Sequence, residues 1–429
     1  MLTVETLKEL TPERREAIIA RAKGSIADCE AGTKEILARL KEDPEKELLR
    51  EYGPLREGLR IEDLTVSDDE IDSAFEETEQ GLIDALGDAA SNIERFHEEQ
   101  LERAAWFTEI APGLVCGRVT RPINSVAAYI PGGRAIYPST ALMNLIPAKV
   151  AGVKDIFAMS PPGPGLRIRP EIVVAATLAG AEIIYKLGGA WAIGALAYGV
   201  LDFPKVGKIV GPGSSWVTAA KMAVFGETGI DLPAGPSEGF IIADQDQDPK
   251  IVALDFLAQL EHDPDAAAII VSTSRNVAEN ALDWAETLIP ELDRAEIVRS
   301  SINNAAILVA ESVEDAVEFA NRYAPEHLQL MVADPMSYLE QIENAGSVFL
   351  GRYSPIPAGD YATGTNHVLP TGGSAAFFSG LSTDSFLKKI SFQTLSKEAL
   401  EDIAPTVVTL AEAEGLECHA RTVKARLEG

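Results

Sequence analysis

The chain has 429 residues, of which 46% are hydrophobic and 24% are charged, and its formal net charge at pH 7 is −29. This length predicts two or three domains, and the hydrophobic fraction is that of a globular protein rather than a disordered one. The large negative charge disfavours binding to phosphate backbones and to anionic membrane surfaces, so we expect no nucleic-acid and no membrane partner.

The cysteines and the apolar segments indicate the cellular compartment of the protein. The three cysteines stand in no C-x-x-C spacing, which favours a reducing compartment. The first residues lack a basic region followed by an apolar core, so we expect no secretory signal. The most apolar stretch, residues 172–201, is interrupted by charges and glycines and does not qualify as a membrane span. We therefore expect a cytoplasmic protein.

Residues 1–110 are rich in charge and are expected to form a helical N-terminal arm or lid. Apolar residues at helical spacing would line one face of one or two long helices: Ile71, Phe75, Leu82, Leu86, Ile93 and Phe96. His97, which follows Phe96, has the pattern of an ordinary exposed helix residue.

Residues 111–236 are expected to form a first α/β domain, because short apolar runs alternate with helical stretches. Its strands are predicted at 126–130, 155–159, 182–186 and 208–210, and each is followed by a glycine-rich turn. Ligands bind beyond the carboxyl ends of parallel strands, so these turns predict a site for a nucleotide or another anion. No G-x-G-x-x-G is present, and any single glycine is equally well explained by a tight turn.

Residues 237–380 repeat this pattern as a second α/β domain, and residues 381–429 return to helix as a C-terminal tail. Strands of the second domain are predicted at 240–243, 267–271, 306–309, 328–332 and 347–350. The segments between them are long enough for right-handed crossovers. The expected fold is therefore α/β, with two Rossmann-like domains, each an open and mostly parallel sheet, and helical N-terminal and C-terminal extensions.

Four of the five histidines stand in short polar segments, and these are His262, His327, His367 and His419. Histidine titrates near neutral pH and is the commonest metal ligand, so this pattern points to one composite active site. Gln259 precedes His262 by three residues on a helix expected at about 249–261, which places both side chains on one face. A histidine at a helix end is more often structural.

Further ligands nevertheless favour a metal site. Asp360 and His419 complete a set of two imidazoles, one carboxylate and one amide oxygen, which suits zinc better than calcium or magnesium. Asp360 stands among small residues in a loop that ends at His367 and could wrap closely around a ligand.

Two other motifs concern proton transfer and nucleophilic attack. Glu326 and His327 are adjacent after a proline, which suits general acid–base catalysis, although a helix start with an incidental histidine is an equal alternative. Ser237 stands in a G-x-S-x-G pattern, but the residues after it predict a strand where a nucleophile elbow requires a helix. A serine hydrolase is therefore rejected, and a hydroxyl that reaches a substrate is the better interpretation.

Taken together, these stretches resemble the histidinol dehydrogenase family from about residue 121 to residue 426. The most specific motifs are Tyr129-Ile-Pro-Gly-Gly, Tyr137-Pro-Ser-Thr-Ala-Leu-Met143, Ile146-Pro-Ala-Lys-Val-Ala-Gly-Val153, Ala234-Gly-Pro-Ser-Glu238, Gln259-Leu-Glu-His262, Ala324-Pro-Glu-His-Leu328, Gly359-Asp-Tyr-Ala-Thr-Gly-Thr-Asn-His-Val-Leu-Pro-Thr371 and Glu414-Gly-Leu-Glu-Cys-His-Ala420.

The resemblance implies a homodimer with shared active sites and one Zn²⁺ per subunit. It implies oxidation of L-histidinol to L-histidine, the last step of histidine biosynthesis, in two NAD-dependent steps through L-histidinal. The implied zinc ligands, which also contact substrate, are Gln259, His262, Asp360 and, from the other subunit, His419. His327 would be the general base and Glu326 would activate water, while Ser237, His367 and Glu414 would hold substrate.

The implied NAD contacts are Tyr129, Trp191 and Ser214, and the last two depart from the family pattern. The family's Gly-Gly-Ala-Gln-Ala reads Gly188-Gly-Ala-Trp-Ala192 here, and its Gly-Pro-Gly-Asn reads Gly211-Pro-Gly-Ser214. An indole lacks the hydrogen-bonding arm of glutamine and fills more space, so it either stacks on a cofactor ring or obstructs the usual cofactor pose.

Two other functions stay open from the sequence. One is a paralogous zinc- and NAD-dependent dehydrogenase of another small polar alcohol, such as a sulfonated diol. Glu414 and His367 favour the imidazole substrate over that alternative. The other is a non-catalytic protein that binds a metal or a nucleotide, which the Glu326–His327 pair disfavours because binding alone needs no general base.

Overall fold

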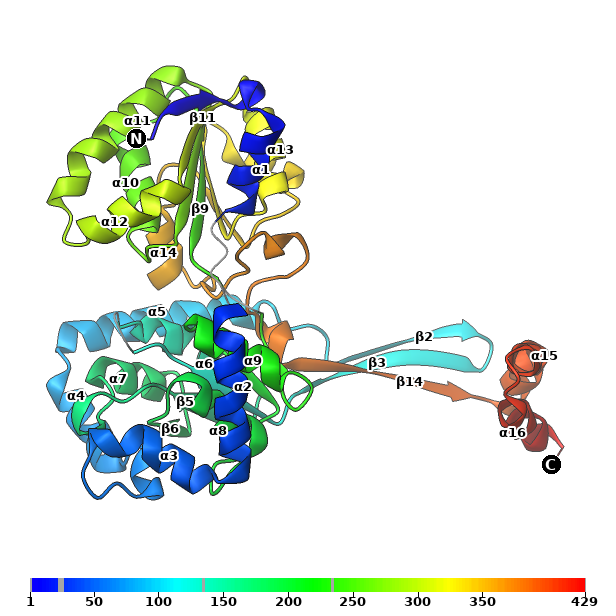
Figure 1. Ribbon diagram of the computed structural model, residues 1–429. Coiled ribbons are helices and arrows are strands. Elements are labelled where there is room, and N and C mark those ends of the chain that lie inside the picture. The colour runs from blue at the N-terminus through cyan, green and yellow to red at the C-terminus, as the bar shows by residue number, and fades with distance from the viewer. Residues whose placement is uncertain (1, 22–26, 133–135, 233–234, 429) are drawn as a thin grey trace.

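The computed structural model describes residues 2–21, 27–132, 136–232 and 235–428. Figure 1 shows two α/β lobes stacked on each other and a long arm that leaves the lower lobe and ends in two helices. The predicted α/β class with mostly parallel sheets is confirmed. No helix within these ranges is long and apolar enough to cross a membrane.

The lower lobe contains a parallel sheet whose strand order is β6-β5-β4-β7-β8. Its strands are β4 (Ser125–Tyr129), β5 (Asp155–Met159), β6 (Ile183–Tyr185), β7 (Lys208–Val210) and β8 (Gly229–Ile230). From the central β4 the chain proceeds to one side through β5 and β6, and later to the other side through β7 and β8. The topological switch point, where ligands bind to such sheets, therefore lies between β4 and β7.

Two layers of helices cover each face of this sheet. One face carries α6 (Pro138–Val150) and α7 (Pro170–Leu178), with α4 (Asp68–Glu77) and α5 (Gln80–Glu98) outside them. The other carries α8 (Gly189–Tyr198) and α9 (Ser215–Val224), with α2 (Ala27–Glu42) and α3 (Pro44–Tyr52) outside. Because α6 and α8 are buried along most of their length, a second layer must cover them. Residues 27–98 thus form the outer layer of the lower lobe.

The upper lobe contains a parallel sheet whose strand order is β1-β11-β10-β9-β12-β13. Its strands are β1 (Val4–Thr6), β9 (Glu238–Ala243), β10 (Ala267–Ser272), β11 (Ala306–Val309), β12 (His327–Met331) and β13 (Ser347–Leu350). Helices α10 (Pro249–Leu260), α11 (Arg275–Leu288) and α12 (Ala295–Ser301) pack on one face, and α1 (Pro12–Ala20) and α13 (Val313–Tyr323) pack on the other.

The N-terminal residues are shared between the two lobes. Strand β1 pairs with β11 and α1 covers the upper sheet, whereas α2 begins the outer layer of the lower lobe. The sequence predicts only helices in this region. Strand β1 is three residues long, so it is too short to show an alternation that distinguishes it from a helix.

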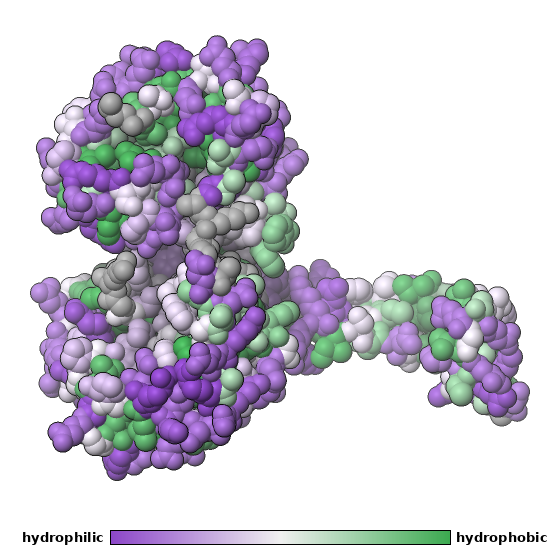
Figure 2. Space-filling model, viewed as in Figure 1, coloured by the Kyte–Doolittle hydropathy of each residue, from purple (hydrophilic) through white to green (hydrophobic). Residues whose placement is uncertain are grey.

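The arm is an antiparallel sheet that the sequence analysis did not predict. It consists of β14 (Leu387–Leu395), β3 (Leu114–Pro122) and β2 (Ala105–Ala111), followed by α15 (Lys397–Ala413) and α16 (Glu417–Leu427). The tail expected to be helical therefore contains a nine-residue strand, which follows the short 3-10 helix η9 (Thr383–Phe386). Large apolar side chains on the arm are exposed, among them Phe107 at 73% and Ile110 at 63%. The space-filling view shows apolar surface along it (Figure 2).

His97 is fully buried, so the prediction that it is an exposed helix residue is wrong. It stands four residues after Ile93 and shares the inner face of α5 with it, whereas Phe96 is 39% exposed. Its Nδ1–H donates to the carbonyl of Ile93 at 2.8 Å, and its Nε2 accepts from Asn366 Nδ2 at 3.4 Å. Burial lowers the pKa of His97, so the fold favours the neutral ring. Leu82, also expected on the inner face, is exposed as well.

We expect His97 to make the folded protein sensitive to acid. Its pKa is lower in the folded state than in the unfolded chain, so stability is lost as pH falls below the ordinary histidine value of about 6.5. In His97→Gln the free energy of unfolding should be lower near neutral pH but should fall less between about pH 7.5 and about pH 5.5. Urea unfolding of both proteins at these pH values measures the two slopes. Equal slopes would show that His97 does not titrate with folding.

Candidate active site

The acid–base pair predicted from the sequence lies at the amino end of the upper sheet. His327 is the first residue of β12 and pairs with Gly239 of β9 and Ser347 of β13. Strand β9 begins where the chain crosses from the lower lobe (Figure 1). His367 Nε2 lies 3.3 Å from Thr140 Oγ1 on α6, the helix that follows β4. The amino end of the upper sheet thus meets the carboxyl end of the lower one.

The side chains of Glu326 and His327 are both buried and both contact the backbone of Glu238. The amide of Glu238 donates to Glu326 Oε2 at 2.7 Å, and its carbonyl accepts from His327 Nδ1 at 3.1 Å. The Nδ1–H therefore points at a carbonyl, which leaves the lone pair on Nε2. His327 Nε2 lies 3.6 Å from Asp360 Oδ1 and has no hydrogen-bond partner among the described residues.

Nearby carboxylates oppose the effect of burial on the pKa of His327, whereas burial itself raises the pKa of Glu326. Burial alone would lower the pKa of His327, but the carboxylates of Glu326 and Asp360 together raise it well above its usual range. Burial raises the pKa of Glu326, although His327 opposes that shift. Both shifts favour the protonated form of each group relative to its ordinary state, and two adjacent proton-carrying groups are what general acid–base catalysis uses.

Three of the four predicted metal ligands lie beside this pair. Helix α10 ends at Leu260, so His262 lies just beyond the helix rather than on it, and its amide donates to the Gln259 carbonyl at 3.4 Å. Asp360, on α14 (Ile356–Tyr361), interacts electrostatically with His262. Burial lowers the pKa of His262, and the carboxylate of Asp360 offsets only part of that shift.

Gln259 offers an unsatisfied oxygen at this point. A Cβ at Gly239 would lie 2.4 Å from Gln259 Cγ, so only glycine lets that side chain lie against the start of β9. The Gln259 Oε1 atom is buried and has no hydrogen-bond partner in the described residues. A buried amide oxygen without a donor is a suitable ligand for a cation, and together with the interacting pair of His262 and Asp360 it makes a set of residues that fits zinc.

The fourth predicted ligand is not brought to this place. His419 lies on α16 and Glu414 at the end of α15, both exposed at the far end of the arm (Figure 1). In the part of the chain that the structure describes, no group of three His, Cys, Asp or Glu side chains could hold a metal.

The remaining predicted substrate contacts flank the pair. Ser237 is half-buried and directly precedes β9. His367 is held by the carbonyl of Asp360, 3.0 Å from its Nδ1, and burial lowers its pKa. Gly133 and Ala234, which belong to two of the motifs, lie outside the described residues.

Tyr129 and Ser214 lie near the carboxyl ends of β4 and β7, beside the switch point of the lower sheet. Tyr129 ends β4, and its hydroxyl accepts from the amide of Gly189 at 3.3 Å. Gly211, after β7, has φ +105°, and a Cβ there would lie 2.2 Å from the Tyr129 carbonyl oxygen. Ser214 is exposed and directly precedes α9, whose amino end is a favourable place for a phosphate.

The Trp191 side chain, on α8, is anchored to Glu47 of the outer helix α3. Its indole N–H donates to Glu47 Oε1 at 3.0 Å, and Arg39 and Arg50 bind the same carboxylate. Burial alone would raise the pKa of Glu47, but the bonds from Arg50, Arg39 and Trp191 lower it to about 2. The indole is therefore a fixed wall of the turn after β6, next to Gly189.

Sequence reasoning missed two residues that contact the acid–base pair or its support. Glu238 stands within a recognised motif, but nothing in the sequence indicates that its backbone holds Glu326 and His327. Arg21 binds Glu238 from a region predicted as a helical arm, and its position in the sequence gives no signal for this contact.

Comparisons with known proteins agree on one family. The sequence model of the histidinol dehydrogenase family matches residues 19–427 of this chain. The histidinol dehydrogenase of Methanocaldococcus jannaschii is 46% identical over 427 residues, which cover 100% of this chain and 99% of that protein. That of Methanosarcina barkeri is 45% identical and covers 99% and 98%. The crystal structure of histidinol dehydrogenase from Elizabethkingia anophelis has a TM-score of 0.94 and 39% identity, and covers 100% and 98%.

Proposed function

Because this chain belongs to the histidinol dehydrogenase family, we propose that it oxidises L-histidinol to L-histidine in two NAD-dependent steps through L-histidinal, the last step of histidine biosynthesis. The observation that carries this function is the buried Glu326–His327 pair, whose free imidazole nitrogen lies 3.6 Å from Asp360. A protein that only binds a ligand needs no buried acid–base pair of this kind.

Zinc, one ion per subunit, would be held by Gln259, His262, Asp360 and His419 of the partner subunit. The orphaned Gln259 Oε1 and the electrostatic interaction between His262 and Asp360 support this assignment. Bound there, zinc would fix the substrate nitrogens in place without taking part in electron transfer. The proposal includes Ser237, His367 and the partner's Glu414 as substrate contacts.

In the first oxidation, His327 would accept the proton of the substrate hydroxyl on Nε2 while hydride leaves the carbinol carbon for NAD⁺. The Nδ1–H bond to the Glu238 carbonyl keeps this tautomer in place. Coordination of Asp360 would remove part of the negative charge that raises the pKa of His327, which would favour the neutral ring that acts as a base.

In the second oxidation, Glu326 would accept a proton from the water that adds to the aldehyde, and the hydrate would lose its hydride to a second NAD⁺. The elevated pKa of Glu326 suits this transfer. L-Histidinol, two NAD⁺ and one water thus give L-histidine, two NADH and three protons. Both steps use groups that the backbone of Glu238 holds, so the reactive aldehyde need not leave between them.

NAD is proposed to bind at the switch point of the lower sheet, on Tyr129, Trp191 and Ser214. The glycine turn after β7 and the free amino end of α9 support a pyrophosphate there. The indole of Trp191 would take the place of an amide, and its bond to Glu47 would hold it in one orientation toward the cofactor.

A homodimer in the cytoplasm is proposed as the working form. The arm exposes Phe107, Ile110 and Phe392 far from both lobes, which is unusual for the surface of a monomer. The arm also carries His419 and Glu414, so its docking on a second copy would bring both residues to that copy's site.

We expect the purified, zinc-loaded protein to form two NADH per L-histidinol. Absorbance at the NADH band measures this ratio, and parallel reactions with NADP test whether the fixed Trp191 changes the preferred cofactor. A ratio of one would mean that the aldehyde is released rather than oxidised. No turnover with either cofactor, although zinc is bound, would reject histidinol as the substrate and favour another small polar alcohol.

Substitution of the acid–base pair should separate the two oxidations. In Glu326→Gln, kcat for supplied L-histidinal should fall by about 10²–10⁴-fold, because no carboxylate accepts the proton of water. In His327→Asn, kcat for L-histidinol should fall to a similar extent. Zinc content, measured by atomic absorption, should stay that of the parent protein in both variants. Normal kcat for both substrates in either variant would remove that residue from the mechanism.

Sharing of sites between subunits can be tested by mixing two inactive variants. Asp360→Asn and His419→Asn should each be inactive as homodimers. In a heterodimer of the two, one site combines an intact Asp360 with an intact His419 of the partner subunit. Co-expression at equal levels should therefore restore roughly one quarter of the parent activity, since half of the dimers are mixed and each has one intact site. No restoration would place both ligands in the same subunit.

A further inference from the structure

The ion pair between Arg21 and Glu238 is buried beside the acid–base pair and has no assigned role. Arg21 follows the last residue of α1 with φ 38°, a conformation that residues other than glycine rarely adopt. Its side chain is 2% exposed and that of Glu238 is 5% exposed. The guanidinium binds both carboxylate oxygens of Glu238, at 2.6 and 2.7 Å, in the bidentate geometry that arginine favours.

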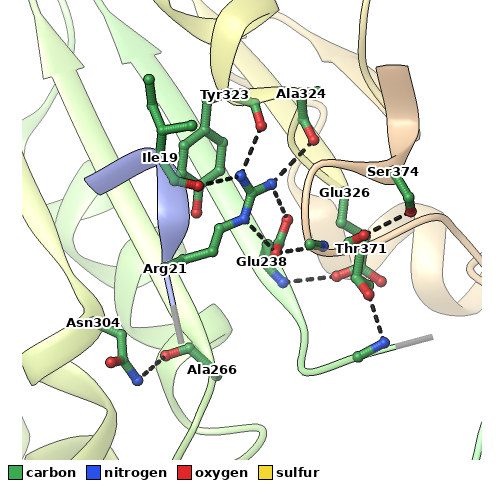
Figure 3. Close-up of polar contacts among 12 residues, drawn as sticks. Ile19, Arg21, Glu238, Ala266, Asn304, Tyr323, Ala324, Glu326, Thr371 and Ser374 are labelled. Carbon is green, nitrogen blue, oxygen red and sulfur yellow. Dashed lines mark hydrogen bonds and ion pairs between the residues drawn. The ribbon is translucent and has the colours of Figure 1, made fainter. Parts of the chain in front are cut away.

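Arg21 uses all five of its N–H donors. Besides Glu238, they reach the carbonyls of Ile19 at 3.1 Å, Tyr323 at 2.8 Å and Ala324 at 3.2 Å. The guanidinium carbon also lies 3.7 Å from the centre of the Tyr323 ring. Figure 3 shows Arg21 extending from α1 into the space between the start of β9 and the turn after α13.

These contacts join the two segments that carry the acid–base pair. Tyr323 ends α13, and Ala324, with φ 51°, begins the turn that leads through Pro325 to Glu326. Glu238 begins β9, and its amide and carbonyl bind Glu326 and His327. The Glu238 side chain is held on its other side by the amide of Gly372 at 2.7 Å. The Arg21 guanidinium therefore fixes both the Tyr323–Ala324 turn and the backbone of Glu238, which orients the pair.

We propose that Arg21 is a positioning residue for Glu326 and His327. It acts through the backbone of Glu238 and through the Tyr323–Ala324 turn. This inference rests on the proposed roles of Glu326 and His327. Within the described residues Arg21 forms no hydrogen bond with either side chain, so its contacts act on their orientation, while its charge also interacts electrostatically with Glu326. A misplacement of about 1 Å at a reacting group costs on the order of 10²-fold in rate, so a support of this kind is measurable in kcat.

The test compares Arg21→Met and Arg21→Lys with Arg15→Met as the matched control. Arg15 lies on α1, the helix that Arg21 follows, donates to the Leu7 carbonyl at 3.0 Å and lies over the Phe319 ring at 5.8 Å. It thus docks α1 against Leu7 and α13 and, among the described residues, forms no hydrogen bond with Glu238. Loss of α1 docking would affect both positions, whereas loss of positioning would affect Arg21 alone.

We expect Arg21→Met to lower kcat for L-histidinol and for L-histidinal by about 10–10²-fold, with KM for L-histidinol and zinc content within about twofold of the parent. Arg21→Lys should recover only part of kcat, because an ammonium cannot bind both Glu238 oxygens and the turn carbonyls together. Arg15→Met should keep kcat within about twofold. Parent-like kcat in a folded Arg21→Met protein, or an equal loss in Arg15→Met, would overturn the inference.

A second variant covers the case in which Arg21→Met does not fold, because it leaves a buried carboxylate without a partner. The double variant Arg21→Met with Glu238→Gln removes both charges and keeps the backbone groups of residue 238. A folded double variant with low kcat and normal KM supports positioning, and one with parent-like kcat overturns it. If the parent protein oxidises histidinol and Glu326→Gln is impaired, a failure here concerns Arg21 alone and leaves the proposed function intact.

Discussion

The backbone of Glu238 is the constraint on which the arrangement of the site depends. Its N–H and C=O both face the segment of Glu326 and His327, and the two groups that the proposed chemistry needs bind one each. This is possible because β9 and β12 are neighbours in a parallel sheet, with Gly239 opposite His327. The position of the pair is therefore set by strand register, which is more rigid than a loop.

The lower lobe uses a similar device at its own strand end. Lys221 and Asp231 form a buried ion pair, and both bind the backbone of Gly211 in the turn after β7: the amide donates to Asp231 at 2.6 Å and the carbonyl accepts from Lys221 at 2.9 Å. Buried ion pairs add little net stability, because desolvation offsets the attraction between the charges. Their consequence here is geometric, since each fixes a turn at the junction of the lobes.

The sequence predicts the parts of the fold that are local and periodic. Strands β5, β7, β11 and β13 begin and end where the short apolar runs predict, because a buried parallel strand is such a run. Of the site, the sequence predicts the groups with distinctive chemistry, and the structure brings His262, His327 and Asp360 together. Their roles as ligands and as a base remain predictions.

What the sequence does not predict depends on contacts between distant residues. Arg21 meets Glu238 across 217 positions, and no local pattern distinguishes it from the other arginines of the N-terminal region. The error at His97 is different in kind, because its spacing from Ile93 already places it on the inner face of α5. His97 is predicted to be exposed because histidine is polar, in spite of this spacing. One donor and one acceptor are nevertheless enough to satisfy a buried neutral ring.

Because the chain is acidic, salt affects the charges on its surface more than the buried ion pairs near the site. With 66 acidic and 37 basic residues, the surface repels itself, and salt screens that repulsion over a Debye length of about 8 Å near physiological ionic strength. Arg21 and Lys221 lie inside, where their side chains are 2% and 3% exposed and salt screens their pairs far less. The stability of the whole chain can therefore vary with salt while the turns that orient the site keep their geometry.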